Sequence, residues 1–188
     1  LRETFSSIYK TNYTIGNYNS SIGLAVNLFN FSLDADISII EMGANYPNEI
    51  DYLCEIIKPN YSLVTNIQSA HIGNFNSIEE LKETKLSIFK HTHDNGFIFE
   101  NADDFNIVGN HKYRKNKIRF GFKNSNVDFF GDFKNINNKN HFFINGKEIY
   151  NSRLNEIMAK NMLAAYSIAH TYGINHSIIK KVFKNFNF

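Results

Sequence analysis

Short apolar runs alternate with segments of helical spacing through the first hundred residues, and this alternation constrains the fold more than any other feature. The runs 37–40, 61–64 and 97–99 predict strands, whereas 47–57 and the segment after Ser77 predict helices. Buried parallel strands are continuously apolar, and such alternation is typical of parallel sheets with right-handed crossovers. We therefore predict an α/β fold with a mostly parallel, Rossmann-like sheet and flanking helices.

The pattern changes after Asn110, where short aromatic runs are separated by polar turns. The dipeptide Asn145-Gly146 is a strong signal for a two-residue hairpin. We predict a small antiparallel subsheet over residues 117–150 within the same domain. Helical spacing resumes at about Asn155, on a stripe from Ile157 to Ile168.

Size and composition favour one domain with an ordinary surface. The chain has 188 residues, 43% of them hydrophobic, and a net charge of +2, which argues against a nucleic-acid or membrane surface. No apolar run approaches the length of a membrane span. The single cysteine, Cys54, excludes an internal disulfide, fits a cytoplasmic location, and is expected to be a buried structural thiol.

Polar residues follow two of the predicted strands, where ligands bind in open α/β sheets. Glu41 comes after the run 37–40, and His71 follows the run 61–64 within a loop of small residues. A carboxylate after a buried strand is costly unless it is paired or binds a metal. Glu41 is therefore either a capping or salt-bridged acid or a magnesium ligand, and His71 is either a structural hydrogen-bonding residue or a ligand.

Lys85 lies on the helix predicted after this loop, close to the apolar stripe of Leu81, Ile88 and Phe89. It is either a solvated lysine or a partly desolvated amine, and desolvation lowers the pKa of an amine. Further along, Asn101-Ala102-Asp103-Asp104 is either an Asx turn or a loop that contacts a nucleotide base. No phosphate-binding loop motif and no zinc-type spacing occur in the sequence.

Six blocks, taken in order and with their spacing, resemble the Mur ligase family. They are Gly16-Asn17-Tyr18-Asn19, Glu41-Met42-Gly43-Ala44-Asn45, Thr65-Asn66-Ile67-Gln68-Ser69-Ala70-His71, Lys85, Asn101-Ala102-Asp103-Asp104 and Asn161-Met162-Leu163-Ala164-Ala165. Each block alone is weak, but the ordered set covers nearly the whole chain. The block that begins at Glu41 favours the family member that adds D-alanyl-D-alanine.

The resemblance implies an ATP-dependent amide ligase that joins D-alanyl-D-alanine to UDP-N-acetylmuramoyl-tripeptide through an acyl phosphate. It implies that Glu41 and His71 hold Mg²⁺ and that Lys85 becomes carbamylated. It also implies that Asn101 and Asn161 lie near the adenine of ATP, and that Asn17 and Asn19 lie near the nucleotide-sugar substrate.

The resemblance also implies that residues 1–188 are the family's central ATP-binding domain. The family's phosphate loop would lie just before Leu1, and an N-terminal and a C-terminal domain would flank the chain. Two positions depart from the family pattern, since Ile157 replaces a frequent histidine and Gln68 replaces a usual glycine. Two alternatives stay open: another Mur-type or folylpolyglutamate-type ligase, and a degenerate, non-catalytic nucleotide-binding or scaffold module.

Overall fold

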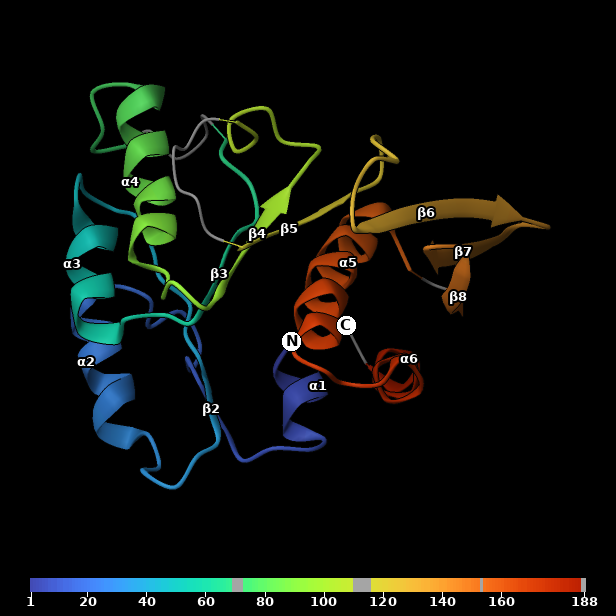
Figure 1. Cartoon of the computed structure of the whole chain (residues 1–188), viewed down its shortest axis with the longest axis horizontal. Helices are drawn as coiled ribbons and strands as arrows, with labels where there is room; N and C mark the ends of the chain where they lie inside the picture. Colours follow the sequence, from blue (N-terminus) through green and yellow to red (C-terminus); the bar gives the residue numbers. More distant parts are fainter. Residues whose placement is uncertain (69–72, 110–115, 153, 187–188) are drawn as a thin grey trace.

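Within the described residues, the fold combines two sheets with six helices, and Figure 1 shows how these elements are arranged. The computed structural model describes residues 1–68, 73–109, 116–152 and 154–186. The described elements, in chain order, are α1 (Arg2–Ser6), β1 (Thr11–Tyr13), α2 (Ser21–Asn30), β2 (Ile37–Ile39), α3 (Glu49–Ile57), β3 (Tyr61–Val64), α4 (Ile78–His91), β4 (Phe97–Asn101), β5 (Asn116–Gly121), β6 (Phe129–Ile136), β7 (Lys139–Ile144), β8 (Lys147–Ser152), α5 (Glu156–Thr171) and α6 (His176–Asn185).

The strands form one two-stranded and one six-stranded sheet. Strands β1 and β2 pair in parallel, and the larger sheet has the order β3-β4-β5-β6-β7-β8. Pairing is parallel from β3 to β6 and antiparallel from β6 to β8. The predicted mostly parallel α/β fold is therefore confirmed.

The antiparallel part begins later than residue 117, where we expected it. Strand β5 pairs in parallel with β4 on one side and with β6 on the other, so it belongs to the parallel sheet. The antiparallel meander comprises β6, β7 and β8 and continues the same sheet. The aromatic run 118–122 was misassigned because a buried strand has the same composition in either kind of pairing.

Two-residue turns join the strands of the meander. Asn137 and Asn138 have φ of 52° and 60°, and Asn145 and Gly146 have φ of 49° and 76°. Positive φ at both central residues is the conformation that asparagine and glycine favour in tight hairpins. The hairpin predicted at Asn145-Gly146 is confirmed, and the β6–β7 hairpin projects from the body of the domain (Figure 1).

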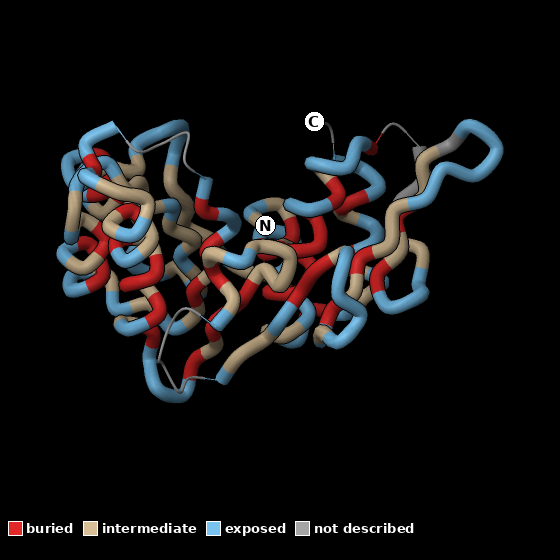
Figure 2. The backbone as a smooth tube through the Cα atoms, turned by 90° about the horizontal axis from the view of Figure 1, so that it is seen from above, coloured by how far each residue is buried: buried red, intermediate tan, exposed pale blue. Residues whose placement is uncertain are grey.

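Many of the buried residues belong to two hydrophobic clusters, and Figure 2 shows the buried segments of the chain in red. The larger cluster lies where α5 and α6 pack against the sheet, and Phe142 and Leu163 are fully buried in it. The smaller cluster lies under α4 and includes Phe89 and Ile98. Within the described residues, no helix is long and apolar enough to cross a membrane.

Apolar side chains on α2 and at the start of α5 face solvent rather than the core. On α2, Ile22 is 78% and Phe29 is 92% exposed, whereas Leu24 and Asn27 are buried. On α5, Ile157 is 72% exposed, although Ile168 on the same predicted stripe is buried. The helix predicted over the stripe from Ile157 to Ile168 is confirmed, but the periodicity of a helix does not specify which of its sides the neighbouring elements cover.

Cys54 is fully buried in α3, as predicted. Burial, together with the nearby charge of Asp51, raises the pKa of its thiol to about 12. Its Sγ lies 3.8 Å from Sδ of Met42, so the thiol packs against the chain that follows β2. A thiol that stays protonated at neutral pH is a poor nucleophile, which agrees with a structural role.

Candidate functional site

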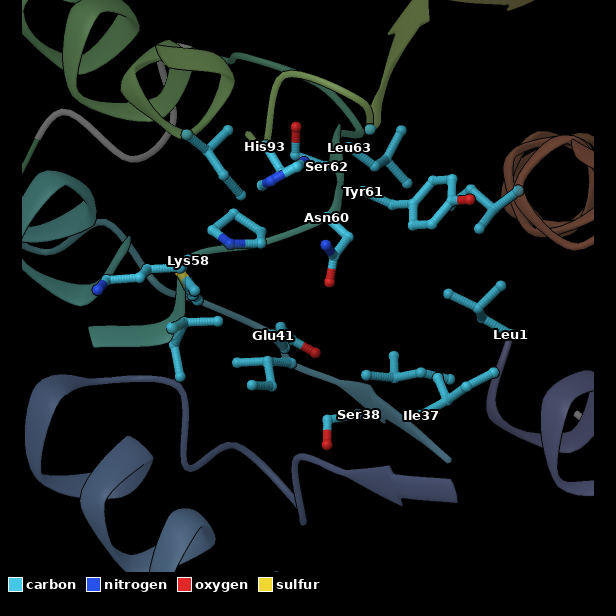
Figure 3. A pocket seen from close by; sticks show the side chains of 18 of the residues that line it. Leu1, Ile37, Ser38, Glu41, Lys58, Asn60, Tyr61, Ser62, Leu63 and His93 are labelled. Atoms are coloured by element: carbon cyan, nitrogen blue, oxygen red, sulfur yellow. The ribbon is translucent and has the colours of Figure 1, made fainter. Parts of the chain in front are cut away.

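A pocket of about 1300 Å³ separates the two sheets. All residues of β2 and all residues of β3 line it, so these two strands face each other across the opening, as Figure 3 shows. Within the described residues β2 pairs only with β1, and β3 pairs only with β4. The backbone edges of two parallel strands therefore border one space, and its rim at their carboxyl ends carries Glu41, Thr65, Asn66 and Lys85.

Glu41 stands two residues after β2 at this rim and is exposed. Its backbone N–H donates to Thr14 Oγ1 at 2.9 Å. Its Oε1 accepts a hydrogen bond of 3.0 Å from Nδ2 of Asn19. We expected the strand before Glu41 to be buried, and this was wrong, because β2 lines the open pocket and is only partly buried. The neutral partner Asn19 orients the carboxylate without removing its charge.

The loop of residues 14–19 lies beside the segment that follows β2. Besides the contact with Glu41, the backbone oxygen of Asn19 accepts from the N–H of Gly43 at 2.7 Å. A Cβ atom at Gly43 would come within 3.0 Å of Asn19 Oδ1, so a side chain there would press on the asparagine amide. This loop and the Glu41 segment are consequently held as one unit.

Lys85 lies on α4 and reaches the same pocket, as predicted. Its side chain is half-buried, and this burial lowers the pKa of its amine below the usual value, while the charge of Asp104 acts in the opposite direction. The expected partial desolvation is therefore confirmed. A lowered pKa increases the fraction of neutral amine, which is the nucleophilic form.

The segment Asn101–Asp104 forms the predicted Asx turn, since Asn101 Oδ1 accepts the N–H of Asp103 at 3.1 Å. Its Nδ2 donates to the backbone oxygen of Thr65 at 2.8 Å, which ties the end of β4 to the end of β3. Next, Oδ2 of Asp104 accepts the N–H of Ile67 at 2.7 Å. Asp103 accepts the N–H groups of Phe122 and Lys123, at 2.7 and 3.0 Å.

One turn thus joins the chain segments that follow three neighbouring strands. Asn106 adds a second bond to Ile67, donating from Nδ2 to its backbone oxygen at 3.1 Å. We call the side chains of Asn101, Asp103, Asp104 and Asn106 the strand-end clamp. Sequence reasoning missed this role for Asp103, Asp104 and Asn106, because their partners lie 19 to 39 residues away.

The other predicted site residues are less closely joined to the pocket. His71 lies outside the described residues. Asn17 and Asn161 are exposed, on the 14–19 loop and on α5, and neither lines the pocket. The structure therefore brings together Glu41, Asn19 and Lys85, with Asn101 attached through Thr65.

The side chains at the rim suit Mg²⁺, which takes part of its coordination shell from water and substrate. They suit a metal ion that is coordinated by protein side chains alone less well. Within the described ranges no group of three or more His, Cys, Asp or Glu side chains is placed to hold a metal ion. Magnesium is usually bound through one or two carboxylates, with waters and substrate phosphates completing its shell. The exposed carboxylate of Glu41 beside an open pocket satisfies that requirement.

Comparison with known proteins identifies the family. Residues 1–169 match the profile of the Mur ligase middle domain. The chain is 33% identical over 193 residues to UDP-N-acetylmuramoyl-tripeptide--D-alanyl-D-alanine ligase of Buchnera aphidicola subsp. Baizongia pistaciae, covering 96% of this chain and 41% of that protein. It is 32% identical over 125 residues to the ligase of the same name from Escherichia coli, covering 63% and 27%. The chain belongs to the Mur ligase family.

Solved structures share the fold. MurF from Acinetobacter baumannii aligns with a TM-score of 0.85 at 22% identity, over 99% of this chain and 42% of that one. MurF ligase from Thermotoga maritima, in complex with ADP, aligns with a TM-score of 0.82 at 23% identity, over 95% and 43%. The chain therefore spans well under half the length of the relatives it matches.

Proposed function

We propose that this chain is the central, ATP-binding domain of a ligase that joins D-alanyl-D-alanine to UDP-N-acetylmuramoyl-tripeptide. The curated relatives carry that name, and the Acinetobacter and Thermotoga structures support the fold. The observation that carries the proposal is the shared pocket, because Glu41, just after β2, and Lys85, in the middle of α4, both line it. The proposal places the activity in the cytoplasm, where ATP is available.

In this proposal Glu41 and His71 hold magnesium, and Lys85 carries a carbamate that adds a second carboxylate-like group. Bound magnesium would offset the negative charge that develops during phosphoryl transfer. Asn19 orients the Glu41 carboxylate, and the strand-end clamp holds Thr65 and Asn66 at the rim. Asn101 and Asn161 are proposed to lie near the adenine, and Asn17 and Asn19 near the nucleotide-sugar substrate.

We place the phosphate loop of the family in a segment before Leu1, because the 188 residues contain no phosphate-loop motif. The space between β2 and β3 supports this division, since 1300 Å³ exceeds the 300–1,000 Å³ usual for a ligand pocket. Leu1 lines the same space, so a segment that precedes it would start at the pocket. Such a segment could pair with both open strand edges and present its loop at the rim.

The test is the activity of the full-length protein with purified substrates. Phosphate release from ATP should require UDP-N-acetylmuramoyl-tripeptide, and formation of the amide should require D-alanyl-D-alanine as well. Use of a different amino acid or of a folate in place of D-alanyl-D-alanine would favour the other ligases. ATP binding without phosphate release under any of these conditions would favour the non-catalytic module.

A further inference from the structure

Asn27 is a buried amide whose hydrogen bonds all go to backbone atoms. It lies on the covered face of α2 and is only 2% exposed. Its Oδ1 accepts the N–H of Ile15 at 3.0 Å. Its Nδ2 donates to the backbone oxygens of Tyr18 and Gly23, both at 2.9 Å. Nδ2 donates both of its protons in these hydrogen bonds, so it has no donor left for another partner.

These bonds reach both ends of one short turn. Ile15 and Tyr18 flank Gly16 and Asn17, so a single side chain fixes where the turn begins and where it ends. Gly16 has φ of 58°, and the turn has internal hydrogen bonds from the N–H of Tyr18 to the oxygen of Ile15 at 3.3 Å and from the N–H of Asn19 to the oxygen of Asn17 at 2.8 Å. The bonds to Asn27 add the attachment of this turn to α2. The backbone of Tyr18 approaches α2 so closely that a Cβ atom at Gly23 would lie 2.6 Å from it.

The far side of the turn leads to the pocket. The residue after Tyr18 is Asn19, which bonds Glu41 through its side chain and Gly43 through its backbone oxygen. The turn is thus held between α2 on one side and the end of β2 on the other. Asn27 supplies the α2 side, although it lies well away from the rim residues in the sequence and does not line the pocket.

We propose that Asn27 is a positioning residue that holds the 15–18 turn in place for the nucleotide-sugar substrate. This inference rests on the proposed function for the identity of that substrate. Asn27 touches neither substrate nor reacting atoms, and it acts through Asn17 and Asn19 on the turn. Its effect falls mainly on binding of the nucleotide-sugar substrate, with a smaller effect on Mg²⁺-ATP through the hydrogen bond of Asn19 to Glu41.

The experiment uses the full-length protein with Asn27→Leu, which keeps the volume but removes all three bonds, and with Asn27→Asp, which keeps only the acceptor for Ile15. The matched control is Asn30→Ala, because Asn30 is an exposed amide on the same helix that bonds the oxygen of Val26 at 2.7 Å. We expect KM for UDP-N-acetylmuramoyl-tripeptide to rise about tenfold in Asn27→Leu, the effect of losing roughly 1.4 kcal/mol of hydrogen bonding. KM for ATP should rise much less, because the turn reaches the proposed magnesium ligand only through the bond of Asn19 to Glu41.

Hydrogen exchange gives a reading that does not depend on activity. The Ile15 amide should exchange more slowly than the Asn17 amide in the wild-type protein, and Asn27→Leu should remove that difference. Equal exchange of the two wild-type amides would overturn the inference even if no variant folds. Equal rises in both KM values would also overturn it, since they indicate general destabilisation. If the wild-type protein shows no ligase activity, the proposed function fails, whereas the exchange rates still decide the role of Asn27.

Discussion

Nδ2 of Asn19 donates to Oε1 of Glu41 at 3.0 Å, which links a loop before α2 to the carboxylate after β2. The two residues are 22 positions apart, and the bond is exposed at the pocket rim. A metal-binding carboxylate that keeps one oxygen bonded in this way has fewer orientations to lose when it binds the ion. The loop would therefore support the proposed metal site without itself carrying charge.

Asn19→Ala in the full-length protein should weaken the binding of Mg²⁺. Removing a residue that hydrogen-bonds a metal ligand lowers metal affinity by about tenfold or more. Calorimetric titration with Mg²⁺ in the presence of a non-hydrolysable ATP analogue would measure this change. The control is Asn12→Ala, which removes an amide that bonds Ser32 instead. Equal Mg²⁺ affinity in Asn19→Ala and wild type would contradict the expectation.

Lys85→Met should abolish ligase activity and still make the protein more stable at neutral pH. Burial lowers the pKa of Lys85, so the protonated amine costs free energy in the folded state. Because the pKa of Lys85 is lower in the folded than in the unfolded state, the wild-type protein is destabilised below the folded pKa. This destabilisation disappears as the pH rises to the unfolded pKa. We expect a rise in Tm of about 2 °C at neutral pH, which scanning calorimetry measures, and a smaller rise at pH 10. A fall in Tm at neutral pH would contradict this reasoning.

Asp104→Ala should destabilise the domain by about 2–4 kcal/mol, because it removes two hydrogen bonds to a carboxylate and leaves the N–H of buried Ile67 unpaired. Urea denaturation measures the change. Asp103→Ala is the matched comparison, since Asp103 accepts two N–H groups on the β5 side. Both variants should lose stability, but only Asp104→Ala should increase exchange of the Ile67 amide. The same exchange at Ile67 in both variants would refute the separate roles of the two acids.

The stability of the domain should fall in acid because Asp51 becomes protonated. The carboxylate of this residue joins α3 to α4. Burial raises the pKa of this carboxyl, but hydrogen bonds from His91 and Ser87 and the charge of Lys90 outweigh burial, so the net pKa lies below its usual value. A lowered folded pKa gives stability that is present above the unfolded pKa and is lost as pH falls through the folded one. Asp51→Asn should therefore be less stable than wild type at pH 7, and the difference should shrink below about pH 4. Thermal melts across this range measure it. A difference that does not depend on pH would exclude the ionised carboxyl as its source.

The parallel α/β fold and some of the residues at the rim of the pocket could be predicted from the sequence. Continuous apolar runs, and the residues that follow them, are local signals that a single sequence contains. Glu41 and Lys85 were found for that reason. Ser77 likewise predicted the start of α4, where its Oγ accepts the N–H of Glu80 at 3.1 Å. The exposure of Glu41 was missed, since it depends on the space between the sheets.

Other features depend on partners that no local pattern specifies. The bond from Ile67 to Asp104 spans 37 residues, and the polar strand β1, with Asn12 at its centre, forms because β2 lies alongside it. The exposed stripe of α2 shows the same limit, since the buried amide of Asn27 interrupts an otherwise apolar face. Long-range pairing decides these features, and one sequence does not contain that information.

Within the described residues, β2 and β3 each have one edge without a strand partner. These edges also affect how the stability of the domain is linked to the binding of a ligand. No ladder hydrogen bond joins the two sheets within the described residues, so Glu41 and Lys85 lie on different halves of the domain. Packing of α3 against α4 connects these halves and includes the hydrogen bond between Asp51 and His91. A strand bound between the edges would set the separation of the halves at two strand spacings, roughly 9–10 Å. Completion of the sheet and binding of nucleotide would then be linked equilibria, each strengthening the other.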